Sequence, residues 1–113
     1  MDMSQLKKDF RISELNDLYG SLLTKHQSDA LRSYYDYDFS LSEIAENIGV
    51  SRQAVHDTIA KAEEQLAVLE DKLGLLRKNE CMRKSAEIAL DELCGGNVEL
   101  VKDFLKRIID NRF

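Results

Sequence analysis

The sequence contains no proline and no tryptophan, and only 5 of its 113 residues are glycine. Proline breaks the interior of a helix and glycine weakens it, so their scarcity favours helices over turn-rich β-structure. Aromatic residues are also few, at 7% of the chain. We therefore expect an all-α protein whose core is built mainly from aliphatic side chains.

Cysteine is scarce as well. Cys81 and Cys94 belong to no Cys-x-x-Cys pair, which excludes a disulfide framework and the usual spacing of a zinc site. Two reduced cysteines are typical of a cytosolic protein. No apolar run approaches the length of a membrane span, and residues 1–10 lack the apolar core of a signal peptide. We expect a cytoplasmic protein without membrane insertion.

The motifs of common enzymes are also missing. The sequence has no phosphate-binding loop, no glycine-rich dinucleotide turn and no metal-ligand spacing. The two histidines, His26 and His56, are 30 residues apart, and no serine, cysteine or carboxylate has an evident activating partner. We interpret the chain as a non-enzyme with no catalytic residue, no metal and no cofactor.

Residues 40–59 carry the most informative pattern, which predicts a helix, a tight turn and a second helix. Ser40 and Glu43 have the spacing of a capping box, which starts a helix at residue 41. Gly49 can adopt the left-handed conformation that ends it. Between them lies one apolar face, formed by Leu41, Ile44, Ala45 and Ile48.

The second helix is predicted to follow Ser51, which is a good N-cap. Val55 and Ile59 carry its buried face, and Val50 is expected to fill the corner between the helices. Near its start, the outward-facing residues are Arg52, Gln53 and His56, with Thr58 to one side. Arginine and glutamine can make bidentate contacts to base edges, and a recognition helix presents such residues at its N-terminal end. The alternative is a helical hairpin whose polar face is simply solvated.

Charge weighs against a tight complex with DNA. The net charge is -5 and the pI is about 5.0, whereas autonomous DNA-binding domains usually carry a basic patch. Asp57 lies among the candidate contact residues, where it would repel phosphate. We expect any DNA affinity to be weak and sensitive to salt.

Two further helices are predicted before this pair. Residues 4–20 form the first, whose apolar face carries Leu6, Phe10, Ile12, Leu15, Leu18 and Tyr19. Thr24 and Gln27 form a second capping box, so another helix begins at Lys25. Four aromatic residues follow, and core or corner packing is favoured over the stacking of nucleic-acid bases for Tyr34, Tyr35, Tyr37 and Phe39.

The second helix of the pair continues as a heptad pattern. Its apolar residues are separated by four and three positions in turn, and they are Val55, Ile59, Ala62, Leu66, Leu69, Leu73 and Leu76. Such a seam needs a partner helix, which can lie within the chain or in a second copy. We expect Leu66, Leu69, Leu73 and Leu76 to serve in helix packing or in a homodimer. Gly74 lowers helix propensity and predicts a bend or break.

Two domains are expected: a helix-turn-helix domain over residues 1–76, and a long helical C-terminal extension over residues 77–113 that packs on it. Residues 77–87 are mostly polar and favour a solvated helix face, with contact to phosphate or RNA as the alternative. Gly95 and Gly96 mark a stop, and Asn97 is expected to cap a last amphipathic helix.

The span from Leu23 to about Leu76 resembles region 4 of bacterial sigma factors. The residues that carry this resemblance are Leu23, Thr24, Gln27, Leu31, Tyr34, Tyr35, residues 42–46, residues 49–51, Val55 and Ile59. The resemblance implies a sigma-region-4-like helix-turn-helix domain.

Residues 5–78 are more particularly similar to the YlxM-like family of helix-turn-helix proteins of Gram-positive bacteria, through the runs at 48–55 and 69–76. That family is linked to the signal recognition particle genes, mainly by gene neighbourhood. The resemblance therefore implies a small DNA-binding regulator, or an accessory, of the protein-targeting pathway, with components of the signal recognition particle as partners.

These observations lead to two functional hypotheses. In the first, the protein is a DNA-binding regulator whose groove-facing residues are Ser51, Arg52, Gln53, His56, Thr58 and Lys61, with Thr24 and Lys25 near phosphate at a helix N-terminus. In the second, the same fold is an adaptor that binds a protein or ribonucleoprotein of the targeting machinery and has no specific DNA site. The motif favours the first hypothesis and the acidic balance favours the second.

Overall fold

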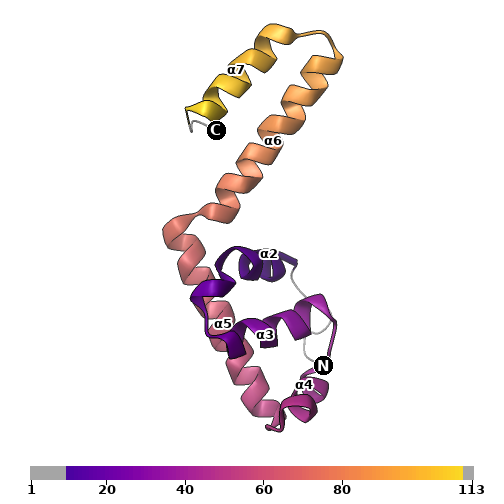
Figure 1. Ribbon diagram of the computed structural model, residues 1–113, viewed down its shortest axis with the longest axis vertical. Coiled ribbons are helices and arrows are strands. Elements are labelled where there is room, and N and C mark those ends of the chain that lie inside the picture. Colours follow the sequence, from indigo (N-terminus) through magenta and orange to yellow (C-terminus); the bar gives the residue numbers. More distant parts are fainter. Residues whose placement is uncertain (1–9, 111–113) are drawn as a thin grey trace. The chain divides into compact units, whose positions relative to one another are not determined.

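The structure is a computed structural model that describes residues 10–110, and no strand occurs in this range. In chain order, its elements are α2 (Phe10–Tyr19), the 3-10 turn η1 (Gly20–Leu22), α3 (Lys25–Leu31), the π-helical turn η2 (Arg32–Asp36), α4 (Leu41–Ile48), α5 (Arg52–Leu73), α6 (Leu75–Cys94) and α7 (Val98–Ile109) (Figure 1). The prediction of an all-α fold is confirmed. None of the helices described is long and apolar enough to cross a membrane.

The chain divides into two compact units, Met1–Leu73 (unit 1) and Gly74–Phe113 (unit 2). Gly74 has a φ of 65°, in the left-handed region, and it separates the end of α5 from the start of α6. Glycine suits this position because it has no Cβ to clash with the backbone. The predicted break at Gly74 is therefore present, and the division falls just before the boundary expected at residue 76.

In unit 1, α2, α3 and α4 pack along α5 (Figure 1). The face of α5 that they cover carries Val55, Ile59, Ala62 and Leu66, each no more than 5% exposed. These residues follow one another at spacings of four, three and four, which places them on one face of a helix. As far as Leu66, the predicted heptad therefore packs within the chain.

Both predicted capping boxes are present, and they start α3 and α4 at the expected residues. Thr24 Oγ1 accepts a hydrogen bond from the Gln27 N–H at 3.1 Å, and Gln27 Oε1 accepts one from the Thr24 N–H at 3.2 Å. Ser40 and Glu43 make the equivalent pair, with both bonds at 3.1 Å. Gly49, at a φ of 72°, ends α4 as predicted.

The turn between α4 and α5 differs from the prediction at two apolar residues. Ile48 and Val50 are 45% and 43% exposed, although both were expected to pack inward. Ile48 is the last residue of α4 and Val50 follows its C-cap Gly49, so both lie beyond the buried residues of that helix, which are Leu41, Ile44 and Ala45. Backbone hydrogen bonds close the corner instead, because the Ala45 carbonyl accepts from the N–H groups of Gly49 at 2.9 Å and Val50 at 3.1 Å.

A buried polar pair, which no local sequence pattern predicts, joins α2 to α3. Asn16 Nδ2 donates to the Ser28 carbonyl at 3.2 Å, and Ser28 Oγ donates to Asn16 Oδ1 at 3.1 Å. Gly20 lies against this pair, where a Cβ atom would be 2.8 Å from Asn16 Oδ1 and 2.9 Å from Ser28 Oγ. Both distances are below ordinary van der Waals contact, so only glycine fits here without a shift.

The remaining predictions for the first helices have mixed outcomes. The predicted start of the first helix at residue 4, and Leu6 with it, lie outside the described residues. Core packing is confirmed for Tyr34, which is 2% exposed, and it is wrong for Tyr37, which is 62% exposed. The reason is that α3 continues through η2 as far as Asp36, so that Tyr37 starts the connecting segment on the surface.

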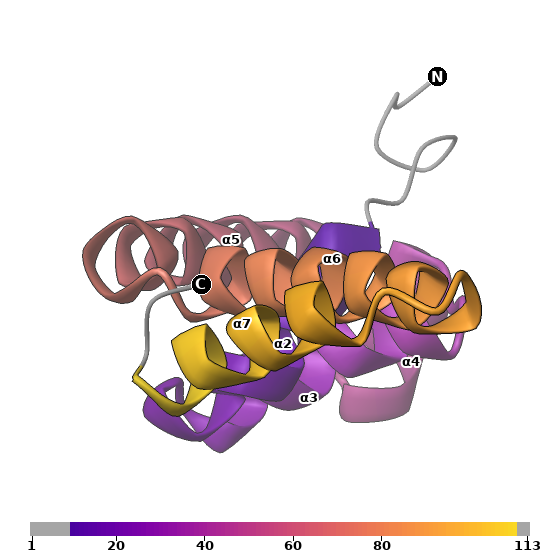
Figure 2. The same cartoon turned by 90° about the horizontal axis from the view of Figure 1, so that it is seen from above.

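Unit 2 is a helical hairpin in which α6 and α7 lie side by side (Figures 1 and 2). The predicted stop after Cys94 is present, and Gly96 has a φ of 84°. Asn97 caps α7 as predicted, since its Oδ1 accepts from the Leu100 N–H at 3.4 Å. Only two residues of α6, and none of α7, are buried, so this hairpin has little core of its own.

Candidate nucleic-acid interface

The first turn of α5 is anchored by Ser51. Its Oγ accepts a hydrogen bond from the Ala54 N–H at 3.0 Å, and its carbonyl accepts from the Val55 N–H at 3.2 Å. Val55 is 2% exposed and fixes this end of the helix in the core, while Arg52 and His56 beside it are exposed. A rigid helix start thus presents a guanidinium and an imidazole to solvent.

Gln53 is exposed on the same turns, but its side chain already has a partner. Gln53 Nε2 donates a hydrogen bond of 2.9 Å to Asp57 Oδ1, one turn further along α5. The same Oδ1 atom lies 3.6 Å from His56 Nδ1. Asp57 therefore sits between two of the candidate contact residues, and its negative charge opposes the approach of a phosphate to either.

Thr58 and Lys61 are placed less favourably for contact with a DNA groove near Arg52. Thr58 is half-buried, and its Oγ1 donates to the Ala54 carbonyl at 3.0 Å, so its hydroxyl proton is used within α5. Lys61 follows Arg52 by nine residues, or about 14 Å along the helix axis. It lies beside Leu22 and Val68 around a shallow hollow between η1 and α5. Their roles in DNA binding stay predictions.

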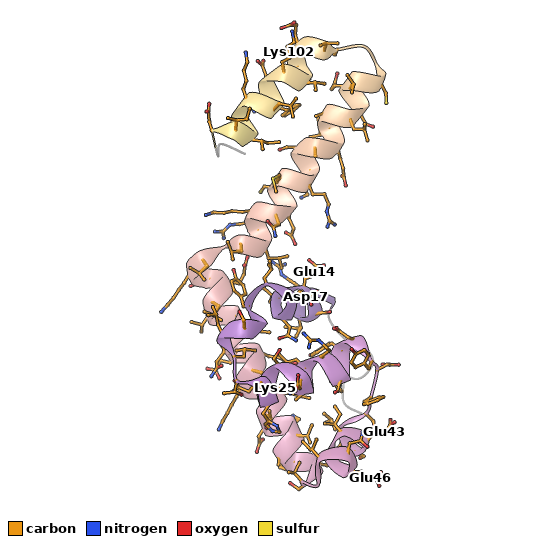
Figure 3. All side chains as sticks on the ribbon, viewed as in Figure 1. Glu14, Asp17, Lys25, Glu43, Glu46 and Lys102 are labelled. Carbon is orange, nitrogen blue, oxygen red and sulfur yellow. The ribbon has the colours of Figure 1, made fainter. Side chains whose placement is uncertain are left out.

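Thr24 and Lys25 stand at the N-terminus of α3. The Thr24 hydroxyl oxygen is taken up by the capping box, and Lys25 Nζ pairs with Asp29 Oδ2 at 3.3 Å on an exposed surface. Surface pairs of this kind exchange readily with solvent and with other ions, so Lys25 remains able to meet a phosphate. Figure 3 shows Lys25 at the start of α3, which is one of the helices that pack against α5.

Acidic side chains lie on the neighbouring helix. Glu43 and Glu46 are exposed on α4, and Figure 3 shows both projecting from the outer side of that helix. Glu43 is held by the Ser40 N–H, while Glu46 has no such role in the cap. Together with Asp57 they make the surroundings of the α5 N-terminus less positive than those of a strong DNA-binding surface.

The four seam leucines do not share one environment. Leu66 is fully buried in unit 1, Leu69 is half-buried and Leu73, the last residue of α5, is 47% exposed. Leu76 lies beyond the break at Gly74, in α6. Leu66 and Leu76 are 0% and 3% exposed, which agrees with packing inside the chain, and a homodimer through the seam stays a prediction.

Comparison with known proteins finds relatives along most of the chain. Residues 6–104 match the family UPF0122, described as "Putative helix-turn-helix protein, YlxM / p13 like". A UPF0122 protein of Desulforamulus reducens is 42% identical over 95% of this chain and 97% of its own length.

Two further relatives are similar over somewhat shorter spans. A UPF0122 protein of Clostridium botulinum is 51% identical over 83% of this chain and 86% of its own length. The UPF0122 protein YlxM of Bacillus subtilis is 47% identical over 83% of this chain and 84% of its own length. With α4, its glycine turn and α5 forming the helix-turn-helix, the chain belongs to the UPF0122 family of YlxM- and p13-like helix-turn-helix proteins.

Proposed function

We propose that this protein is a DNA-binding regulator that places the first turns of α5 in the major groove. The observation that carries the proposal is the exposure of Arg52, Gln53 and His56 at the start of a helix that the buried Val55 and Ile59 hold in the core of unit 1. Because the buried face fixes the helix, the exposed residues can meet base edges at little entropic cost.

Affinity in this proposal is weak and strongly dependent on salt. Arg52, Lys61 and Lys25 are the cations available for phosphate contacts, so the logarithm of affinity falls against that of salt concentration with a slope of about -3. The Asp57, Glu43 and Glu46 carboxylates reduce the affinity further. A regulator of this kind acts in the cytoplasm of a bacterium, and its part in the protein-targeting pathway follows from the family resemblance alone.

The test is fluorescence anisotropy with genomic DNA fragments, titrated from low to moderate salt. The wild type is compared with the double variant Arg52→Ala/Gln53→Ala, which removes the base-reading side chains. A matched control is Gln65→Ala/Lys72→Ala, which removes the same kinds of group from exposed positions further along α5. We expect preference for some fragments, lost in the first variant and kept in the second. The proposal fails if no fragment is preferred at low salt, or if both variants bind alike.

The acidic surroundings of α5 support a second candidate, in which the helix-turn-helix is an adaptor for a protein or a ribonucleoprotein. Glu43, Glu46 and Asp57 would then meet basic groups of the partner. Pull-down with purified components of the signal recognition particle tests this candidate. Glu46→Lys and Asp57→Lys should then reduce retention, and the adaptor function fails if neither wild type nor variant is retained.

A further inference from the structure

Unit 2 leaves an apolar stripe of α6 uncovered. Met82, Leu90 and Leu93 are 37%, 62% and 50% exposed. With Ala86 they follow at spacings of four, four and three residues, so they lie on one face of the helix. The side that meets α7 is a different one, since it carries the buried Ala89 and the half-buried Ser85 and Glu92.

A matching stripe runs along α7. Val98, Leu105 and Ile109 are 48%, 52% and 79% exposed and follow at spacings of seven and four. The residues of α7 that turn toward α6 are the half-buried Val101, Phe104 and Ile108. On each helix, the exposed stripe is rotated by about a quarter-turn around the helix axis from the residues that face the other helix. In both helices this rotation has the direction in which the chain winds. Because the two helices run antiparallel, these rotations bring both stripes to the same face of the hairpin, here called the hairpin face.

The charges along both helices favour antiparallel pairing with an identical hairpin. The first half of α6 carries Arg77, Lys78, Arg83 and Lys84 against Glu80, whereas its second half carries Glu87, Asp91 and Glu92 and no basic residue. On α7, the first half carries Glu99 and Asp103 against Lys102, whereas the second half carries Lys106 and Arg107 and no acidic residue. When each helix meets its own copy in reverse direction, basic segments lie against acidic ones.

The size of the hairpin face also fits a second copy. Its six larger side chains, Met82, Leu90, Leu93, Val98, Leu105 and Ile109, leave roughly 600 Å² exposed, against roughly 800 Å² per partner in a stable complex. A contiguous apolar patch of this size is uncommon on a monomeric protein. Two antiparallel hairpins that meet face to face make a four-helix bundle, whose core would supply what unit 2 lacks alone.

We propose that two copies of this protein associate through the hairpin face, with α6 against α6 and α7 against α7, each pair antiparallel. This interface is separate from the start of α5 and does not depend on DNA binding. Dimerisation would bring two helix-turn-helix units into one complex, which raises the affinity for a pair of DNA sites.

Sedimentation equilibrium of the full chain tests the proposal directly. We expect the dimer to form as the protein concentration is raised to about 100 µM, and a monomer throughout that range would overturn the proposal. The double variant Leu93→Gln/Leu105→Gln should weaken the dimer at least about tenfold. Ile88→Gln is the matched control, because Ile88 is 49% exposed but lies off the stripe on α6. Equal weakening by the control would contradict the assignment of the hairpin face.

One further variant tests the position of the interface. Leu73→Gln, at the exposed end of the leucine seam, should leave the dimer intact, and loss of the dimer there would place the interface on α5 instead. Circular dichroism of each variant is the control for retained helix content.

Discussion

The side-chain amide of Gln53 and the carboxylate of Asp57 form a hydrogen bond of 2.9 Å across one turn of α5. This contact ties a residue that can read a base to a residue that repels phosphate. In the proposed complex with DNA, Asp57 would therefore be the side chain of α5 that most directly opposes binding.

We predict that Asp57→Asn increases affinity for DNA about two- to fivefold, the effect of a charge interaction of about 0.5–1 kcal/mol at an exposed site. The measurement is fluorescence anisotropy at low salt. Asp71→Asn removes the same charge near the far end of α5 and should change the affinity less. An Asp57 variant that binds DNA no better than the wild type would show that this face does not approach phosphate.

The cap of α5 should affect both stability and binding. Ser51→Ala removes the hydroxyl that accepts from the Ala54 N–H, and we expect it to lower the free energy of unfolding by about 1 kcal/mol. Because the first turn then frays, DNA affinity should fall as well. Ser42→Ala, on the exposed surface of α4, should stay within about 0.5 kcal/mol of the wild type in the same urea titration. Equal losses in the two variants would argue against the cap.

Leu66 and Leu73 belong to the same heptad pattern but differ in burial. Leu66→Ala opens a cavity in the core of unit 1 and should lower the free energy of unfolding by about 2–5 kcal/mol. Leu73→Ala, at a position 47% exposed, should change it by less than about 0.5 kcal/mol. Thermal or urea unfolding monitored by circular dichroism distinguishes them. A large loss for Leu73 would instead point to an interface at the end of α5.

Gly20 gives a test of the packing between α2 and α3. Gly20→Ala would place a methyl group within 2.8 Å of Asn16 Oδ1, and we expect a loss of about 1–3 kcal/mol from the strain. Gly95→Ala is the control, since its Cβ would meet only backbone oxygens at 3.6 and 3.7 Å and should cost less than about 0.5 kcal/mol. The packing described for Gly20 would be wrong if both variants unfolded at the wild-type urea concentration.

Local patterns in the sequence predicted much of this fold. The capping boxes at Thr24 and Ser40 need only residues three positions apart, and Gly49 needs only its own backbone freedom. The buried face of α5 follows from the helical repeat for the same reason. These features depend on short stretches of chain, and the structure confirms them.

Features that depend on distant residues were not predictable in this way. Asn16 and Ser28 are buried together because α2 and α3 meet, and nothing near either residue in the sequence indicates a partner. The bond from the Tyr19 hydroxyl to Glu70 Oε1, at 2.8 Å, joins residues 51 positions apart. Ile48 and Val50 are exposed at the end of α4, and a helical repeat does not show which of its positions another helix covers.

The candidate site was predictable as a list of exposed residues, but its electrostatics were only partly so. The sequence predicted Arg52, Gln53 and His56 to be exposed near the start of α5, and all three side chains are exposed. The hydrogen bond between Gln53 and Asp57 depends on rotamers, which sequence spacing permits but does not select. The half-burial of Thr58 similarly depends on how α5 packs in unit 1.

The role of α5 as the recognition helix is tested most directly by an NMR titration. The ¹⁵N-labelled full chain is titrated with a DNA fragment that the anisotropy experiment selects. We predict that the largest chemical-shift changes occur in the backbone amides of residues 51–57, while the amides of α6 and α7 stay unchanged. Shifts confined to the basic first half of α6, or none in the first turns of α5 at saturating DNA, would contradict the claim that α5 is the recognition helix.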